Sequence, residues 1–317
     1  MFQKNVLLKN HTSFKIGGPA KYFFEAKNFK DLVKAVKEAK QKQIPFFILG
    51  GGTKLLVNDK GFNGLIIKIK SSGFKIQENK IISEAGVSLA RLVIASIKAN
   101  LTGLEWAIEI PGTVGGAVHG NCGAFGSSLS KIVKNIVVFN PDSFKIKTYS
   151  NKQCEFKYRG SVFSAHNESA SGEKPNRDII LSAELRLKKG NPKKSLAVIK
   201  EYLKRRRERI SPYPSAGSIF KNYELKSVNY ENDPLVKKFP ELEKLIKGDK
   251  IPVAYLIEKC GLKGKKIGGA KISEKQANII VNFNKAKAEN VSALIDLAKK
   301  KVKKKFRIVL EEEVIMV

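Results

Sequence analysis

The chain has 317 residues, of which 60 are basic and 29 are acidic, and its formal net charge at pH 7 is +31. A hydrophobic content of 42% with 9% aromatic residues indicates a folded protein and excludes an intrinsically disordered one. The sequence contains no apolar run of about 20 residues and no apolar signal-peptide core near its start, so we expect a cytoplasmic protein without a membrane span.

The first third of the chain alternates between helix, strand and glycine loop, which predicts mixed α and β layers. Apolar side chains that recur on one helical face indicate helices, and short apolar or alternating runs indicate strands. The segment at 88–103 begins with a serine that can cap a helix and ends with a glycine that can terminate one. The expected elements are a helix at 30–43 with Leu32, Val33, Val36 and Ala39 on one face, strands at 44–49, 64–69 and 80–87, and a helix at 88–103.

The character of the sequence changes after residues 188–192, where we predict a domain boundary. Before this boundary we expect strands within 132–150 that turn at Asn140, an exposed polar loop at 166–178, and a strand at 178–187. After it we expect amphipathic helices at 195–210, 251–261 and 290–306, the last with a buried stripe of Val291, Leu294, Ile295, Ala298 and Val302, and a final strand at 307–317.

The cysteines and histidines predict neither a disulfide framework nor a metal site. Cys122, Cys154 and Cys260 are an odd number, are widely spaced and form no C-x-x-C pair. The three histidines are equally scattered. This cysteine usage is consistent with a reducing compartment.

The high positive charge allows three interpretations. Nucleic-acid binding is one, because lysine and arginine neutralise phosphates. However, only nine of the 60 basic residues are arginines, and the densest basic runs, at 204–209 and 299–307, lie in segments that also carry an apolar helical stripe. We therefore favour solvated helix faces over a nucleic-acid patch. A basic protein also attracts small polyanions without sequence-specific contacts.

Two glycine-rich stretches are the most informative part of the sequence. Gly50–Gly52 stands between two apolar runs, and residues 110–126 contain six glycines. The chain contains neither a G-x-x-x-x-G-K-[ST] motif nor a G-x-G-x-x-G motif, so a Walker A loop and a Rossmann fingerprint are excluded. Tight turns could explain one such stretch. Two backbone cradles together predict a dinucleotide that is held without a Rossmann turn.

Seven motifs, in order, resemble those of the UDP-N-acetylenolpyruvoylglucosamine reductase family. They are HTSFKIGGPA (11–20), ILGGGTKLLV (48–57), IPGTVGGAVHGNCGAFG (110–126), YRGSVF (158–163), PSAGSIFKN (214–222), GLKGKKIGGAKIS (261–273) and LEEEV (310–314). The resemblance covers nearly the whole chain. It implies an α+β protein with an FAD-binding region of the vanillyl-alcohol-oxidase (PCMH) type, in subdomains 1–70 and 71–190, and a C-terminal α+β substrate domain at 191–317. The chain resembles the shorter, second type of the family.

The resemblance also implies the reaction and its residues. FAD is bound without a covalent bond, NADPH reduces it, and hydride passes to the enolpyruvyl group of a UDP-sugar in peptidoglycan precursor synthesis. Arg159 matches the cation that stabilises the developing enolate, Ser218 the proton donor, and Glu313 the acid that stabilises the intermediate, with Glu311 as the alternative because strand alternation places both on one face. The implied FAD-binding residues are Gly50, Gly51, Gly52, Thr53, Leu55, Gly112, Thr113, Gly115, Gly116, Asn121 and Gly123, and the implied substrate-binding residues are Tyr158, Lys221, Asn222 and Gln276.

Three hypotheses for the function of the chain therefore stay open. The flavin reductase accounts for both glycine stretches and all seven motifs. A basic nucleic-acid-binding protein accounts for the charge only, and a related flavin oxidase with another substrate accounts for the glycines but not for Arg159, Ser218 and Glu313. The segments at 166–178 and 223–250 are longer than the family pattern implies.

Overall fold

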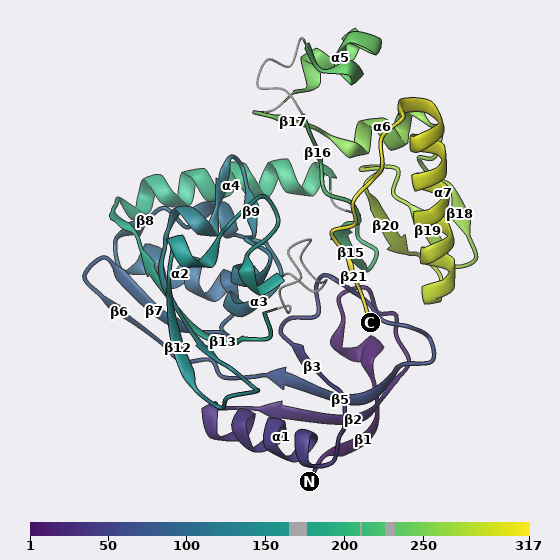
Figure 1. Cartoon of the computed structure of the whole chain (residues 1–317). Helices are drawn as coiled ribbons and strands as arrows, with labels where there is room; N and C mark the ends of the chain where they lie inside the picture. Colours follow the sequence, from purple (N-terminus) through teal and green to yellow (C-terminus); the bar gives the residue numbers. More distant parts are fainter. Residues whose placement is uncertain (165–175, 210, 226–231, 247) are drawn as a thin grey trace. The chain divides into compact units, whose positions relative to one another are not determined.

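The computed structural model describes residues 1–164, 176–209, 211–225, 232–246 and 248–317 (Figure 1). These residues form two compact units. Unit 1 contains Met1–Val6, Ala20–Gly52 and Phe62–Arg207, and unit 2 contains Leu7–Pro19, Thr53–Gly61 and Glu208–Val317. Each unit has its own hydrophobic core. The division at residues 70 and 190 that the resemblance implies stays a prediction.

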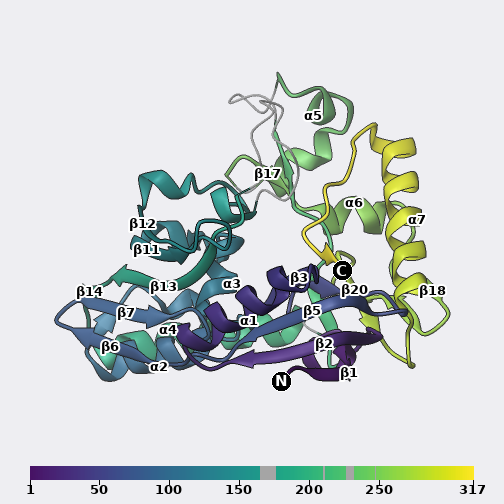
Figure 2. The ribbon, with the colours of Figure 1, turned by 60° about the horizontal axis from the view of Figure 1, so that its bottom comes forward.

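The first sheet of unit 1 contains the strands that lead to the first glycine loop. Its order is β1-β2-β5-β3, with β2, β5 and β3 parallel to one another, as the view in Figure 2 shows. Helix α1 begins at Asn28, whose side chain accepts a hydrogen bond from the Asp31 amide, and its buried face confirms the predicted helix. The elements are β1 (Gln3–Leu7), β2 (Pro19–Ala26), α1 (Phe29–Gln41), β3 (Phe46–Leu49) and β5 (Phe62–Ile69).

The second sheet of unit 1 is antiparallel and has the order β12-β11-β13-β7-β6. The predicted turn at Asn140 is confirmed, because its side-chain oxygen accepts hydrogen bonds from the amides of Asp142 and Ser143. The elements are β6 (Phe74–Gln77), β7 (Lys80–Glu84), α2 (Leu89–Lys98), β8 (Leu101–Thr102), α3 (Val114–His119), β9 (Gly123–Ala124), β10 (Ser127–Ser128), β11 (Val133–Phe139), β12 (Ile146–Ser150), β13 (Ile179–Arg186) and β14 (Lys188–Lys189).

The helix predicted at 88–103 is shorter than expected. Its serine cap is confirmed, since the Ser88 side chain accepts a hydrogen bond from the Arg91 amide. The helix ends at Lys98, not near Gly103, because Leu101–Thr102 pairs with β14 as a strand. Pairing with a distant segment therefore overrides the local helical pattern here.

Helix α4 (Pro192–Arg209) is held to the rest of unit 1 by hydrogen bonds to a buried carboxylate, that of Glu105. The Ser195 hydroxyl donates to Glu105 Oε1 at 2.5 Å, and the Thr102 hydroxyl donates to the same oxygen at 2.6 Å. The Gly103 amide donates to Oε2 at 2.7 Å. Burial alone would raise the pKa of the Glu105 carboxyl, but these donors outweigh it and hold the pKa below the ordinary value of 4.5.

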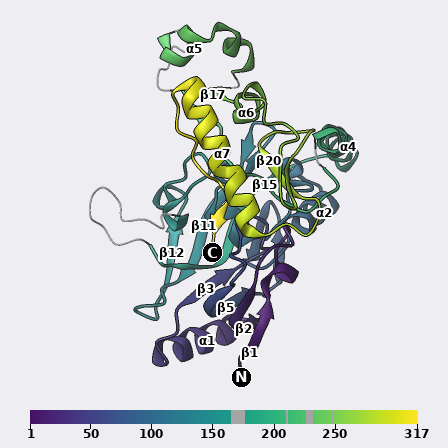
Figure 3. The ribbon, with the colours of Figure 1, turned by 90° about the vertical axis from the view of Figure 1, so that its right-hand side faces the viewer.

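Unit 2 is built on the sheet β15-β20-β19-β18, with α7 lying beside it (Figure 3). Its core also contains Phe14, Ile16 and Leu56 from the first part of the chain. The predicted stripe of α7 is buried and its lysines are mostly exposed, as expected for a solvated helix face. The elements are β4 (Leu55–Leu56), β15 (Ser215–Ser218), β16 (Tyr223–Glu224), α5 (Pro234–Lys238), β17 (Lys250–Ile251), α6 (Val253–Lys259), β18 (Lys266–Ile267), β19 (Ala270–Ile272), β20 (Ile279–Asn282), α7 (Ala288–Phe306) and β21 (Ile315–Met316).

The strand predicted at 307–317 is wrong in its extent. Only Ile315–Met316 pairs, in parallel with β4, while Glu312 makes an isolated bridge to Phe220. The helix predicted at 251–261 is confirmed over the shorter range Val253–Lys259. Of the predicted loop at 166–178, residues 166–175 lie outside the described part of the chain. None of the helices within the described ranges has the length and apolarity needed to span a bilayer.

Candidate functional site

The two glycine stretches meet inside unit 1. The first follows β3 directly, and the second surrounds the short helix α3. A Cβ atom added at Gly50 would lie 2.8 Å from Thr113 Oγ1, so the loop backbone rests against the residue that caps the N-terminus of α3. The Thr113 hydroxyl in turn accepts a hydrogen bond from the Gly116 amide at 3.4 Å. The sequence stretches that we singled out as backbone cradles are thus neighbours.

The glycines of these stretches have different reasons to be glycine. An added Cβ at Gly115 would lie 2.9 Å from the Ala85 Cβ, and one at Gly123 would lie 2.5 Å from the Ser127 carbonyl oxygen, so packing within the protein requires both. At Gly116 the nearest neighbour, Thr113 Oγ1, would be at an ordinary 3.7 Å. Gly116 therefore has no packing reason of this kind, which leaves its backbone approachable by a ligand.

Arg159 lies in a loop that is bound to the second glycine stretch. Its Nη2 donates to the Gly123 carbonyl oxygen at 3.0 Å, and its guanidinium group stands 5.3 Å from the Tyr158 ring centre. The Arg159 backbone has a φ of +52°, a conformation that non-glycine residues seldom adopt. Asn121 ties the two segments together, because its Nδ2 donates to the Lys157 carbonyl at 2.9 Å and its Oδ1 accepts from the Ser130 amide. Unit 1 thus brings Arg159, Tyr158, Asn121 and Gly123 together.

In unit 2, one lysine, Lys54, contacts both Ser218 and Glu313. The sequence alone did not single out this lysine. Lys54 Nζ lies 2.8 Å from Glu313 Oε1 and donates to the Ser218 carbonyl oxygen at 3.0 Å. The Glu313 side chain is only 13% exposed, against 38% for Lys54. The Glu313 amide donates to the Ile219 carbonyl at 2.7 Å, so the main chains of both segments are also joined.

The structure separates Glu313 from its alternative. Glu311 pairs with Lys221 and its side chain is 70% exposed. Glu312 pairs with Lys299 and makes the isolated bridge to Phe220. The nearly enclosed carboxylate beside Ser218 is therefore the one on Glu313.

Asn222 and Gln276, two further predicted residues of unit 2, each accept a main-chain hydrogen bond. Asn222 Oδ1 accepts from the Val253 amide at 3.3 Å, and Gln276 Oε1 accepts from the Asn278 amide at 2.7 Å. Asn278 is a second residue that sequence reasoning missed. It is buried, and its side chain bonds to both the amide and the carbonyl of Phe220, which holds the segment after Ser218 in place. Leu55, from the motif at 48–57, is buried and pairs with Ile315 across β4 and β21.

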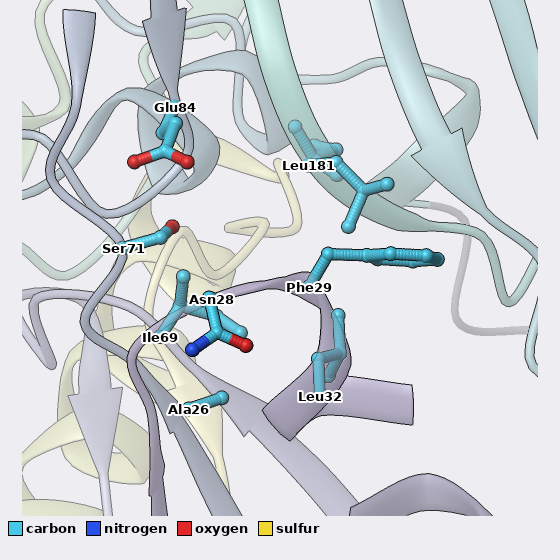
Figure 4. Close-up of a pocket in the computed structure, with 9 residues that line it drawn as sticks. Ala26, Asn28, Phe29, Leu32, Ile69, Ser71, Glu84 and Leu181 are labelled. Atoms are coloured by element: carbon cyan, nitrogen blue, oxygen red, sulfur yellow. The ribbon is translucent and has the colours of Figure 1, made fainter. Parts of the chain in front are cut away.

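A separate cavity of about 60 Å³ lies in unit 1 between α1 and the ends of the sheet strands (Figure 4). Asn28, Ser71 and Glu84 supply its polar groups. Cofactor pockets are several hundred Å³ in volume. The cavity is thus too small for a dinucleotide, and it contains none of the predicted site residues. Within the described residues, no group of three or more His, Cys, Asp or Glu side chains is arranged to hold a metal ion.

Comparisons with known proteins agree with this arrangement. A model described as an FAD binding domain matches residues 20–143, and a model described as the C-terminal domain of UDP-N-acetylenolpyruvoylglucosamine reductase matches residues 209–317. The chain is 36% identical over 316 residues to the reductase of that name from Caldanaerobacter subterraneus, covering 98% of this chain and 91% of that protein. The chain belongs to the UDP-N-acetylenolpyruvoylglucosamine reductase family.

Other members support the same assignment. The Anoxybacillus flavithermus UDP-N-acetylenolpyruvoylglucosamine reductase is 37% identical, with 98% of this chain and 93% of that protein covered. The crystal structure of the reductase from Thermus caldophilus superposes with a TM-score of 0.74 at 27% identity and covers 100% of this chain and 99% of that one. The predicted fold class is thereby confirmed. As a family member the chain is an oxidoreductase of peptidoglycan precursor synthesis with an FAD binding domain, and its 317 residues are consistent with the shorter, second type.

Proposed function

We propose that this chain uses NADPH to reduce the enolpyruvyl group of a UDP-sugar, with Arg159, Ser218 and Glu313 as its catalytic residues. The observation that carries this assignment is the cluster in unit 2, where Ser218 and the nearly enclosed Glu313 meet at Lys54. Two residues about 95 positions apart in sequence, both matched by motif, lie within reach of one ammonium group. A reaction that uses NADPH and a UDP-sugar also agrees with the expected cytoplasmic location.

FAD, when bound, would supply the redox chemistry that links NADPH to the substrate. The proposed holding residues are Gly50, Gly51, Gly52, Thr53, Leu55, Gly112, Thr113, Gly115, Gly116, Asn121 and Gly123. The fit rests on the backbone, because the first loop touches the start of α3 and Gly116 is open to a ligand. The side chain of Asn121 is engaged by Ser130 and Lys157, so its contribution to FAD is through its backbone and through the position of the Arg159 loop.

The substrate requires charge stabilisation and a proton. Hydride addition at C3 of the enolpyruvyl group leaves negative charge at C2 that spreads onto the neighbouring carboxylate. The Arg159 guanidinium, oriented by the Gly123 carbonyl, is suited to fork onto those carboxylate oxygens. The Ser218 hydroxyl donates its proton to C2, which completes the product. Glu313 stabilises the intermediate, and Tyr158, Lys221, Asn222 and Gln276 bind the substrate.

The positive charge has a use in this proposal. FAD, NADPH and the UDP-sugar are all polyanions, and a net charge of +31 raises their rate of encounter. The basic run of α7 lies opposite a buried apolar stripe, as in an ordinary surface helix. No observation in the described residues favours a nucleic-acid site, so we do not propose one.

Separate measurement of the two half-reactions tests the proposal. Ser218→Ala should leave flavin reduction by NADPH close to the wild-type rate and slow oxidation of the reduced enzyme by the enolpyruvyl UDP-sugar about 10²- to 10⁴-fold, the usual contribution of general acid catalysis. Glu313→Gln should act on the same half-reaction, and Glu311→Gln is the matched control with little effect. Equal slowing of both half-reactions by Ser218→Ala would remove the serine from the donor role. Protein that stays colourless after incubation with FAD would refute the proposal as a whole.

A further inference from the structure

Lys54 is held at both its main chain and its side chain. Its carbonyl oxygen accepts from the Ile315 amide at 2.8 Å, next to the parallel pair of β4 and β21. Its ammonium group reaches Glu313 and the Ser218 carbonyl, as described above. Gly217, which has a φ of +70°, lies next to the Lys54 ammonium group, because an added Cβ there would come 3.5 Å from Lys54 Nζ. The lysine is thus fixed in register with the residues that it contacts.

Three consecutive glutamates each pair with a different lysine, and the pairs differ in kind. Lys299 with Glu312 and Lys221 with Glu311 join two side chains. Only Lys54, among these three lysines, bonds both to a carboxylate and to the main chain of the proposed proton donor. Lys54 and Lys299 are equally exposed, at 38% of the side chain, which makes Lys299 a matched control.

We propose that Lys54 is a positioning residue for reduction of the substrate and acts through Glu313 and Ser218. This inference rests on the proposed function. Glu313 can stabilise the intermediate only if its own negative charge is offset, because an uncompensated carboxylate beside a developing enolate would oppose it by like-charge repulsion. The Lys54 ammonium supplies that positive charge and holds the carboxylate in place. The Lys54 ammonium also donates to the Ser218 carbonyl oxygen, which fixes the main chain of the residue that carries the hydroxyl. Loss of the lysine would leave the enclosed carboxylate without this cation.

The first test compares Lys54→Met, Lys54→Arg and Lys299→Met in the FAD-loaded enzyme. Lys54→Met should slow the substrate-reducing half-reaction about tenfold, because a charge-assisted hydrogen bond is lost at a partly exposed group. Flavin reduction by NADPH and the dissociation constant of the UDP-sugar product, measured by calorimetry, should change by less than about threefold. Lys54→Arg should restore most of the rate because it keeps the cation, and Lys299→Met should resemble the wild type.

A double-mutant cycle with Glu313→Gln separates positioning from general destabilisation. If Lys54 acts through the glutamate, Lys54→Met should cost far less in the Glu313→Gln background than in the wild type. Lys299→Met should have the same small effect in both backgrounds. A tenfold loss that persists unchanged in the Glu313→Gln background, or a Lys54→Met variant no slower than Lys299→Met, would overturn the inference.

Failure of this inference can be told apart from failure of the proposed function. If the wild type turns over the UDP-sugar and Ser218→Ala is selective, but Lys54→Met behaves as Lys299→Met does, only the role of Lys54 is refuted. If the wild type does not reduce the UDP-sugar at all, the proposed function fails, and the role of Lys54 fails with it.

Discussion

Replacing Gly50 by alanine separates two reasons for a glycine in the first loop: contact within the protein and contact with a ligand. The new Cβ would lie 2.8 Å from Thr113 Oγ1, about 0.6 Å inside the 3.4 Å at which ordinary contact begins. The threonine must then move and weaken its hydrogen bond to the Gly116 amide. A lost helix cap costs about 1 kcal/mol, and overpacking of this size costs about 1–3 kcal/mol. We expect a total loss of about 2–4 kcal/mol and a fall in Tm of about 4–16 °C.

The assay is thermal unfolding of the FAD-free protein together with FAD affinity from flavin fluorescence. Gly50→Ala combined with Thr113→Ala removes the clashing hydroxyl, so the double variant should recover most of the Tm that the clash cost. Its FAD affinity should stay below that of Thr113→Ala alone if the loop backbone also contacts the cofactor. Gly120→Ala is the control, because its added Cβ would meet only the Gly116 carbonyl at 3.8 Å. A double variant that binds FAD as tightly as Thr113→Ala alone would refute the cradle.

Three further outcomes follow from the described contacts. Asn278→Ala should lower the free energy of unfolding by about 2–4 kcal/mol in urea titrations, because it leaves the buried amide and carbonyl of Phe220 without their partner. Asp59→Ala should lower it by about 1 kcal/mol, because both carboxylate oxygens accept amides in the first turn of α7, whereas Asp59→Asn should keep only part of this cap, because its Oδ1 can still accept but its Nδ2 cannot. The pKa of Glu105 is lowered in the folded state, so its contribution is present above its unfolded value near 4.5 and is lost as the pH falls through the folded pKa. The stability difference between wild type and Glu105→Gln should therefore be constant at neutral pH and shrink in acid titrations below pH 4.5.

Local periodicity predicted the elements whose burial is set along one face. The stripe of α7 and the apolar face of α1 are examples, and both are confirmed. The same reasoning failed where a distant segment decides the structure. The helix expected at 88–103 gives way to β8 because β14 pairs with it, and the strand expected at 307–317 is reduced to β21 because only β4 offers a partner. Neither partner can be read from the local sequence.

In the candidate site, too, motifs predicted some residues, while others are evident only from contacts in the structure. The motifs selected Ser218 and Glu313, and strand alternation could not choose between Glu313 and Glu311, whereas burial distinguishes them. The sequence did not distinguish Lys54, because it is one lysine in a chain with 60 basic residues. The available signal was its position, a charged residue between the triple glycine and the buried pair Leu55–Leu56.

The chain segments that make up unit 2 explain why Lys54, far from the C-terminal segment in sequence, lies beside residues of that segment. Residues 53–61 leave the glycine loop and join the C-terminal segment, where β4 pairs with β21. Phe14, Ile16 and Leu56 complete the core around β15 and α7. Because β4 is held by both this core and the β21 pairing, the residue just before it cannot shift without breaking main-chain hydrogen bonds. Lys54 stands at that position, so the fold itself sets the point at which a cation meets Ser218 and Glu313.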